Sequence, residues 1–291
     1  MTEPADLVIP SQWTHLDVSS LRGTIMVIGA SDTGKSTLAR YLFQELCRAG
    51  LRVAYLDGDV GQSTFGLPAT MTAALSSRAG DERFSPRGPR VAYFVGSTTP
   101  RGNMLPVVVG AYRLQQKALA LGAQVVVVDT TGLVDPADGG RALKQWKIEL
   151  LAPSTVIGLQ RGQELESILW PLRREVRLQV IEWRVSPHVV ERPREARIAR
   201  RRGQLADYFR RARLWVVSLR QMAVYDLDRM AIGALLAFQD AEGFTVGLGV
   251  VEESSRLEKT VTVRTPLPGL EGVTSLRFGA AGWDMANQRE S

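Results

Sequence analysis

The sequence predicts an α/β protein in which a mostly parallel β-sheet flanked by helices is followed by a small β-rich domain. From Gly23 onward, short apolar stretches typical of buried strands alternate with stretches of helical periodicity. Between the first strand and the helix after it the chain reads GASDTGKS, which matches the phosphate-binding loop G-x-x-x-x-G-K-[ST]. After about Arg213, short β-rich segments separated by glycines replace this alternation. The first part is therefore predicted to be a P-loop NTPase domain.

The predicted elements of the α/β part follow one another in a regular order. Residues 24–29 form a buried apolar strand, and the helix after the loop, 35–50, closes at Gly50. The strand 124–132 is apolar up to Asp129, as expected of a central strand buried on both faces. Further strands are predicted at 52–59, 90–96, 153–162 and 177–185, and further helices at 105–122, 141–149, 164–174 and 192–212.

The last part of the chain is predicted to be a small antiparallel barrel or sandwich. Short segments rich in β-branched and aromatic residues alternate there with the turn sequences DAEG and TPLPG. The segments lie at 214–219, 222–227, 231–239, 244–253, 259–267 and 273–284. We therefore predict three parts, which are a short N-terminal segment 1–22, a P-loop domain 23–212 that includes the helix at about 192–212, and a β-rich domain 213–291.

Composition limits the class of protein. The chain has 291 residues, of which 45% are hydrophobic and 23% are charged, so it can bury a full core. No apolar run approaches the ~20 residues of a membrane span, and the N-terminus lacks the pattern of a signal peptide. Cys47 is the single cysteine, which excludes an internal disulfide and a thiolate metal site. We expect a soluble, cytoplasmic protein that does not bind membranes.

The positive charge is concentrated in one segment. The whole chain carries a net charge of +6, whereas residues 192–213 contain nine arginines and two acidic residues, which leaves +7. Arginine suits planar, bidentate contacts with phosphates. A polyanionic partner is therefore indicated, and a solvated basic face is the alternative interpretation.

The phosphate-binding loop supplies most of the predicted nucleotide contacts. Its backbone amides would surround the β-phosphate, Lys35 would reach the β- and γ-phosphates, and the Ser36 hydroxyl would be a Mg²⁺ ligand. Ala30 stands where partitioning ATPases carry a lysine, and no N-K-x-D motif is present to select guanine, so ATP is the expected nucleotide. The predicted nucleotide-binding residues of this loop are Gly29, Ala30, Ser31, Asp32, Thr33, Gly34, Lys35, Ser36 and Thr37.

Two acidic residues end the strand 52–59. Asp57 and Asp59 stand at the ligand-bearing edge of an open sheet, and strand alternation turns them to opposite sides. Asp59 is the candidate general base or metal-side group, and Gln62 is placed to contact the acceptor or a metal-bound water. An aspartate that only caps the loop or holds a Mg²⁺-bound water is the alternative.

Two more loops are predicted at the same edge of the sheet. Asp129 supplies the acid expected in the Mg²⁺ shell, and Thr130 and Thr131 offer hydroxyls near the γ-phosphate. The predicted Mg²⁺ ligands are thus Ser36, Asp59 and Asp129. The segment STTPRGN, 97–103, follows another strand and contributes Thr99 as a candidate substrate contact, although an ordinary Pro-Gly turn explains it equally well.

The helix 141–149 carries a tryptophan among basic residues. Trp146 with Arg141, Lys144 and Lys147 would suit the path of an acceptor strand, by stacking and by phosphate contact. The favoured interpretation is that Trp146 belongs to the core, because a tryptophan on a helix is more often buried.

Five segments carry a resemblance to a known family. In chain order they are GASDTGKSTL, DGDVGQSTFGLP, YFVGSTTPRGN, VVVDTTGLV and VVERPREARIARRRGQLADYF. Together they resemble the polynucleotide 5′-hydroxyl kinases, a family that includes the RNA kinase of the eukaryotic mRNA cleavage factor and tRNA splicing machinery, the pre-rRNA processing kinases and archaeal relatives. The similarity runs from about Gly23 to the C-terminus.

The resemblance implies an activity. The family transfers the γ-phosphate of ATP, with Mg²⁺, to the 5′-hydroxyl end of a nucleic acid, which here would be single-stranded RNA or DNA. By this resemblance Lys35 and Ser36 bind ATP·Mg²⁺, and Asp59 activates the 5′-hydroxyl. The loop 130–132, which ends in Gly132, would clasp the reaction centre. Because Leu133 stands where many eukaryotic members have tryptophan, the choice of acceptor stays open.

The arginine-rich helix matches the lid of this family. The resemblance implies that Arg197 and Arg201, four residues apart on one helix face, close over the transferring phosphoryl group, with Arg192 as a further member. Only a thin stripe of Ile198, Leu205 and Phe209 is available for packing, so the helix is predicted to be weakly held and mobile.

A non-catalytic, ATP-bound scaffold in nucleic-acid processing is the main alternative. A scaffold needs only nucleotide binding, so the presence of Lys35, Asp59 and the arginine-rich helix together favours the kinase. A kinase for a small metabolite would not need so basic a helix.

Overall fold

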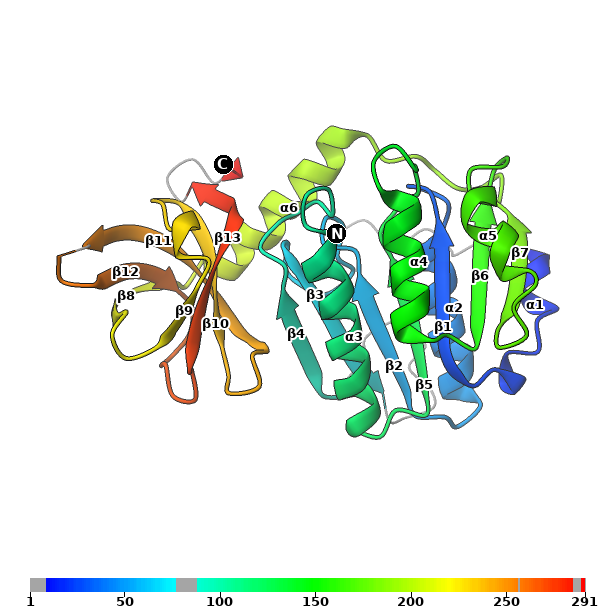
Figure 1. Cartoon of the computed structure of the whole chain (residues 1–291), viewed down its shortest axis with the longest axis horizontal. Coiled ribbons are helices and arrows are strands. Elements are labelled where there is room, and N and C mark those ends of the chain that lie inside the picture. The colour runs from blue at the N-terminus through cyan, green and yellow to red at the C-terminus, as the bar shows by residue number, and fades with distance from the viewer. Residues whose placement is uncertain (1–8, 77–87, 256, 285–288, 291) are drawn as a thin grey trace. The chain divides into compact units, whose positions relative to one another are not determined.

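The computed structural model describes residues 9–76, 88–255, 257–284 and 289–290 (Figure 1). Within these ranges, no helix has both the length and the apolar character required to cross a membrane. The contacts divide the chain into two units that interleave along the sequence. The first unit comprises Met1–Leu56, Ala74–Pro89 and Gln115–Arg192, and the second comprises Asp57–Ala73, Arg90–Leu114 and Pro193–Ser291. The domain boundary at residue 213 stays a prediction.

The chain passes from one unit to the other inside three regular elements. These are strand β2 (Val53–Gly58), strand β3 (Thr70–Ser76) and helix α3 (Met104–Ala120). Each unit is therefore made of three separate stretches of the sequence.

A parallel sheet organises the first unit, with the strand order β2-β5-β1-β6-β7. Strand β1 (Gly23–Gly29) pairs in parallel with β5 (Val125–Thr130) and with β6 (Thr155–Gln160). Strand β6 in turn pairs in parallel with β7 (Gln179–Arg184). The predicted parallel sheet is therefore confirmed.

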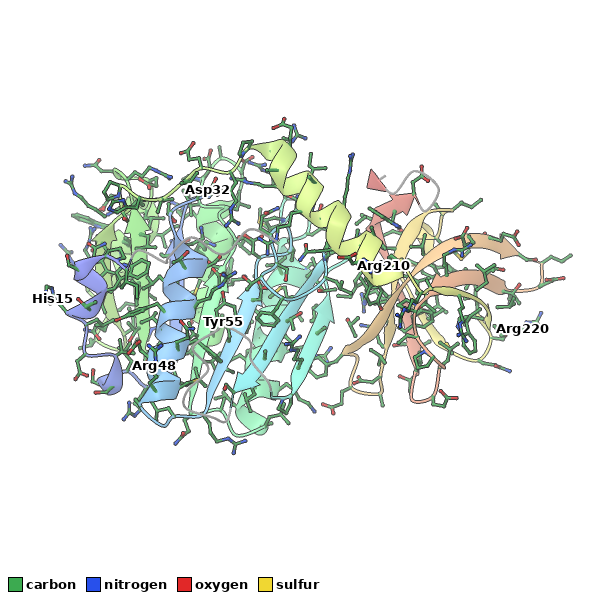
Figure 2. All side chains as sticks on the ribbon, turned by 180° about the vertical axis from the view of Figure 1, so that it is seen from behind. His15, Asp32, Arg48, Tyr55, Arg210 and Arg220 are labelled. Carbon is green, nitrogen blue, oxygen red and sulfur yellow. The ribbon has the colours of Figure 1, made fainter. Side chains whose placement is uncertain are left out.

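Helices cover both faces of this sheet. Helix α2 (Lys35–Arg48) lies on one face, and α4 (Gly140–Leu151) and α5 (Glu166–Leu172) lie on the other (Figures 1 and 2). Every residue of β5 is buried, and β1 is buried from Thr24 onward. Burial on both faces explains why these strands read as continuous apolar runs in the sequence. A short helix α1 (Ser11–Thr14) and a 3₁₀ turn precede β1.

Antiparallel strands make up most of the second unit, in the order β8-β12-β11-β10-β13. The strands after residue 212 are β8 (Arg213–Ser218), β9 (Ala223–Tyr225), β10 (Ala234–Gln239), β11 (Thr245–Ser255), β12 (Thr260–Thr265), β13 (Ser275–Asp284) and β14 (Arg289–Glu290). Each of the six segments predicted for the β-rich part overlaps one of the first six strands. Strand β9 departs from the prediction because it pairs with β13 in parallel.

Two features of the sheet were not predicted correctly. Strand β3 was missed, because its sequence TMTAALS contains no valine, isoleucine or aromatic residue, although every residue of it is buried. Strand β4 (Arg90–Phe94) was expected as a strand, but its antiparallel pairing with β11, with Ala92 opposite Thr245, was not predicted. A pairing across so many residues leaves no trace in the local pattern.

Helix α6 (Arg194–Phe209) is anchored by its C-terminal half. Leu205 and Phe209 are buried in an apolar cluster of the second unit. The other buried members of this cluster are Ala69, Phe94, Leu235, Ala237, Leu248, Val250 and Trp283. The Tyr208 hydroxyl accepts a hydrogen bond from the Leu248 N–H at 2.8 Å, and burial raises the pKa of Tyr208. The prediction of a weakly held helix is therefore wrong for these last turns.

Leu205→Ala should lower the free energy of unfolding by about 2–5 kcal/mol, because it removes a fully buried side chain from the cluster that holds α6. Denaturant unfolding followed by circular dichroism measures the change. Arg202→Ala, at an exposed position of the same helix, is the control and should shift this free energy by less than about 0.5 kcal/mol. Equal effects of the two substitutions would contradict the anchoring role of Leu205.

Candidate functional site

The phosphate-binding loop connects β1 to α2 in the first unit. Gly34 adopts the left-handed conformation, with φ of +86°, directly before Lys35, the first residue of α2. No side chain caps this helix end, so the N–H groups of its first turn suit an anion. Figure 2 shows Asp32 of the loop at this end of α2 and Arg48 at the opposite end. Ser36 and the next residue, Thr37, belong to this first turn, as predicted.

The loop is closed by hydrogen bonds of its own. The Thr33 hydroxyl donates to the Ala30 carbonyl at 3.0 Å, and the Lys35 ammonium donates to the same carbonyl at 2.5 Å. Lys35 is buried, so its charge lies inside the loop rather than on the surface. A cation held in this way is placed to meet a phosphate that enters the loop.

An arginine outside the motif supports the loop. The Arg161 guanidinium donates to the Asp32 carbonyl at 2.6 Å and contacts the Ser31 carbonyl at 3.4 Å. The Glu164 carboxylate accepts the backbone N–H of Arg161 and of Gly162, which fixes the turn after β6. Burial alone would raise the pKa of Glu164, but these N–H donors and the Arg161 charge lower it. No sequence signal pointed to Arg161, because it lay inside the strand predicted at 153–162.

The acidic end of β5 lies beside β1. Asp129 is opposite Val27 in the parallel register and is buried. The Tyr55 hydroxyl donates to Asp129 Oδ2 at 3.0 Å, and the Thr130 hydroxyl donates to the Val27 carbonyl at 2.8 Å. The carboxylate and the turn after it are thus held at the strand end that leads into the phosphate loop.

Gly132 brings this turn into contact with the phosphate loop. A Cβ atom at Gly132 would lie 2.5 Å from Ser31 Oγ, 2.7 Å from Ser31 N and 2.8 Å from Ser31 Cα. Real Cβ atoms do not come so close, so only glycine fits at this position. The predicted residues Asp129, Thr130, Thr131 and Gly132 are therefore brought together with the loop inside the first unit.

Two of the three basic residues considered on α4 do not lie on its surface, whereas Arg141 is exposed. Lys144 and Lys147 are fully buried, so they do not line a path for an acceptor strand. Trp146 is 66% exposed, so the favoured interpretation of it as a core residue was wrong. The Lys144 ammonium instead donates to the Thr130 hydroxyl at 2.9 Å and to the carbonyl of Thr131. Nothing in the sequence distinguished this lysine from a surface lysine.

Asp57 organises the loop after β2 in the second unit. It is buried, and its Oδ2 atom accepts the Ser63 hydroxyl at 2.7 Å and the Thr64 N–H at 2.5 Å. Its Oδ1 atom lies 3.4 Å from the Asp59 nitrogen. Asp57 therefore caps the loop through its Oδ2 atom.

Asp59 follows β2 and has different partners from Asp57. Its Oδ1 atom accepts the N–H groups of Gly61 and Gln62, each at 3.0 Å. The Gln62 amide donates to the Gly61 carbonyl at 2.6 Å, while its own oxygen is buried without a hydrogen-bond partner. Asp59 thus also caps this loop, so the capping alternative is met by both acids, and the separate role of Asp59 stays a prediction.

The segment 97–103 packs against this loop. A Cβ atom at Gly61 would lie 2.7 Å from the Thr98 carbonyl, so the two loops touch through their backbones. Thr99 is exposed, and its hydroxyl accepts the Arg101 N–H at 3.3 Å. Both interpretations of this segment, a substrate contact and an ordinary turn, stay open.

The arginines of α6 reach the loop that follows Asp59. Arg200 donates to the Ser63 carbonyl at 2.9 Å, and Arg201 lies 3.5 Å from the Gly61 carbonyl. Arg197 is half-buried one turn earlier, and Arg192, at the end of the first unit, is exposed. Arg200 was missed in the sequence, because one arginine among nine in the segment 192–213 carries no individual signal.

The predicted site residues form two groups, one inside each unit. The phosphate loop, Asp129 and the turn 130–132 belong to the first unit. Asp59, Gln62, Thr99 and the two predicted lid arginines belong to the second unit.

A strand leading into GASDTGKS, a left-handed glycine at the start of α2 and an acid at the neighbouring strand end define a P-loop nucleotide-binding protein. The chain belongs to the family described as the P-loop of the mRNA cleavage and polyadenylation factor CLP1, whose model matches residues 29–211. The resemblance drawn from the five sequence segments is therefore confirmed.

The chain also resembles individual proteins. A polyribonucleotide 5′-hydroxyl-kinase of Pyrococcus abyssi is 28% identical, over 90% of this chain and 88% of that protein. One of Methanocaldococcus jannaschii is 32% identical, over 69% of this chain and 54% of that protein. A solved complex of Clp1p with a segment of Pcf11p has a TM-score of 0.64 at 13% identity, over 90% of this chain and 75% of that one. The last likeness shows that the fold is shared.

Gly132→Ala should weaken ATP binding at least about tenfold, because the added Cβ would collide with Ser31 and displace the phosphate loop. Isothermal titration with ATP measures the affinity. Gly203→Ala makes the same chemical change where no atom lies within 4 Å, and it should leave the affinity unaltered. ATP binding by Gly132→Ala as tight as by the unaltered protein would show that this contact does not matter to the loop.

Arg200→Ala should loosen the loop after β2, because the Ser63 carbonyl loses a charged donor. We expect faster amide hydrogen exchange at Gly61 and Gln62, by about tenfold, as measured by mass spectrometry of peptides from this loop. The matched control is Arg202→Ala, which removes an equal charge from an exposed position of α6. Unchanged exchange in Arg200→Ala would exclude a supporting role for Arg200.

Proposed function

We propose that this chain is a polynucleotide 5′-hydroxyl kinase, which transfers the γ-phosphate of ATP to the 5′-hydroxyl end of an RNA or DNA strand. The observation that carries the proposal is the family membership, together with relatives named polyribonucleotide 5′-hydroxyl-kinase that match 90% of the chain. The phosphate loop supports it on the nucleotide side, and the loop of Asp59 with the arginines of α6 supports it on the acceptor side.

In the proposed reaction the 5′-hydroxyl oxygen forms a bond to the γ-phosphorus, the bond from that phosphorus to the bridging oxygen breaks, and ADP leaves. Asp59 takes the hydroxyl proton. The two N–H groups that it accepts both end on Oδ1, so the carboxylate is fixed in orientation and Oδ2 is the oxygen assigned to the proton. Gln62 and Thr99 are assigned to the acceptor.

Positive side chains offset the charge that moves during the transfer. Lys35 is assigned to the β- and γ-phosphates, because it is already held inside the phosphate loop. Arg197 and Arg201 are assigned to the transferring group, with Arg192 as a further contact. Fixed cations of this kind act chiefly by electrostatic stabilisation of the transition state.

The donor set of the phosphate loop suits Mg²⁺. Among the residues that the structure describes, no group of three or more His, Cys, Asp or Glu side chains could hold a metal by itself. Mg²⁺ is usually held by one or two protein oxygens together with the nucleotide phosphates, and Ser36 and Asp129 are the proposed ligands, with Asp59 as a further candidate. Bound Mg²⁺ would neutralise charge on the β- and γ-phosphates.

The proposed partner is a nucleic acid with a free 5′-hydroxyl end. The concentration of positive charge in residues 192–213 supports a polyanionic acceptor over a small metabolite. Whether RNA or DNA is preferred is a question for the assay below. A cytoplasmic location stays a prediction.

The decisive assay is transfer of labelled γ-phosphate from ATP to RNA and DNA oligonucleotides of the same sequence with 5′-hydroxyl ends. Asp59→Asn should lower kcat by about 10²–10⁴ while ATP still binds, because the proton loses its acceptor. Arg197→Ala should lower kcat by at least about 10², because a cation is lost from the transition state. Arg202→Ala is the charge-matched control on the same helix and should stay within about threefold of the unaltered protein.

Three outcomes of this assay have distinct meanings. Transfer to either oligonucleotide that depends on Asp59 and Arg197 supports the kinase, and the faster substrate gives the preference. Tight ATP binding without transfer would replace the proposal by a non-catalytic, ATP-bound scaffold. Faster phosphorylation of a nucleoside or small alcohol than of an oligonucleotide would replace it by a kinase of small molecules.

A further inference from the structure

Lys144 is the buried cation nearest in the chain to the turn 130–132. Its side chain is fully buried on α4, and lysine is almost never fully buried without compensating partners. Its ammonium contacts the Thr130 hydroxyl at 2.9 Å, the Thr131 carbonyl, and the Thr131 hydroxyl at 3.4 Å. All these contacts lie within the first unit. The charge of Lys144 is therefore directed at the turn that touches the phosphate loop.

The donors and acceptors of this cluster fix the direction of two hydroxyl groups. An ammonium has three donors and no acceptor, so every oxygen that Lys144 contacts must accept. The Thr130 hydroxyl accepts from Lys144 and donates its own hydrogen to the Val27 carbonyl at 2.8 Å. The Thr131 hydroxyl also faces the ammonium as an acceptor, so its own hydrogen is directed away from Lys144. The hydrogen of the Thr131 hydroxyl is therefore available to donate to another acceptor.

The same cluster is coupled to the phosphate loop through the backbone. The Thr131 carbonyl accepts from Lys144, and the next residue, Gly132, lies too close to Ser31 for any side chain. A movement of Thr131 would therefore move Gly132 against the loop. Lys144 stands at the beginning of this series of contacts, although it is 15 residues from Asp129 in the sequence.

We propose that Lys144 is a positioning residue for phosphoryl transfer, which holds the turn 130–132 against the phosphate loop and orients the Thr131 hydroxyl as a donor to a γ-phosphoryl oxygen. This inference rests on the proposed kinase function. Lys144 itself does not bind substrate in this scheme, since its ammonium is used by the turn. The donor that meets the phosphoryl group is Thr131.

The test is a double-substitution cycle of Lys144→Met and Thr131→Val, with kcat and KM measured in the oligonucleotide assay. Each single substitution should lower kcat at least about tenfold and leave KM for the oligonucleotide within about threefold, because the lost donor acts on the transferring group. The double substitution should be no slower than the slower single one, since both remove the same interaction. Thr131→Ser, which keeps the hydroxyl, should restore most of kcat.

A matched control separates positioning from the general effect of removing a buried cation. Lys147→Met makes the same change at the other fully buried lysine of α4 and should show no coupling to Thr131→Val. Independent, multiplicative effects of Lys144→Met and Thr131→Val on kcat would overturn the proposal. If Lys144→Met does not fold, equal kcat values for Thr131→Val and Thr131→Ser would overturn it as well.

Measurement of ATP and ADP affinities tests the role of Lys144 independently of the kinase activity. Lys144→Met and Thr131→Val should each reduce the preference for ATP over ADP at least about fivefold, with ADP affinity within about twofold, because the oriented donor serves the γ-phosphate alone. Absence of phosphate transfer by the unaltered protein would overturn the kinase function. An unchanged ATP-to-ADP preference in both variants would overturn the role of Lys144.

Discussion

The parallel pairing of β1 with β5 is the constraint on which the nucleotide end of the first unit depends. With Val27 opposite Asp129, the two strands run in the same direction and end at the same edge of the sheet. The phosphate loop and the turn 130–132 therefore emerge side by side, and the hydroxyl of Thr130 joins them through the Val27 carbonyl. A shift of one residue would turn Asp129 to the other face and separate the acid from the loop.

Burial of polar groups in this region is compensated by internal partners. The phosphate loop bonds to itself through Thr33 and Lys35, and Arg161 satisfies two of its outer carbonyls. Behind the turn 130–132, a fully buried ammonium takes hydrogen-bond acceptors from two consecutive threonines. Such a network is rigid. A movement that breaks one of its hydrogen bonds leaves a buried polar group unsatisfied, and this costs free energy. Rigidity of this kind is what transfer of a phosphoryl group requires from its surroundings.

Helix α6 combines two physical properties along its length. Its last turns carry Leu205 and Phe209 into an apolar cluster, so this end is fixed to the second unit. Its earlier turns are rich in arginine, and two of these arginines reach the loop after β2 through backbone carbonyls. One end of the helix is thus an anchor, and the other carries charged groups that contact the loop after β2. The charge of this helix is evident from the sequence. The anchor is marked there only by two apolar residues, Leu205 and Phe209, in a charged segment.

The sequence by itself determined the features that depend on neighbouring residues. The phosphate loop, the parallel strands, α2, the arginine-rich helix and strands β8 to β13 follow from local periodicity and from motifs of fixed spacing, and the structure contains each of them. The resemblance that rested on these motifs was sufficient to give the family. Asp129 and Gly132 could also be placed, because a strand end fixes its own edge of the sheet.

Only the tertiary structure decided which distant residues meet. It gave Asp57 and Asp59 different hydrogen-bond partners, and it paired β4 with β11. Arg161 and Arg200 were brought to backbone carbonyls more than a hundred residues away. It also buried Lys144 and exposed Trp146 on the same helix, against the usual preference of both residue types. Such choices depend on the packing of a helix against elements far along the chain, and local sequence contains no record of that packing.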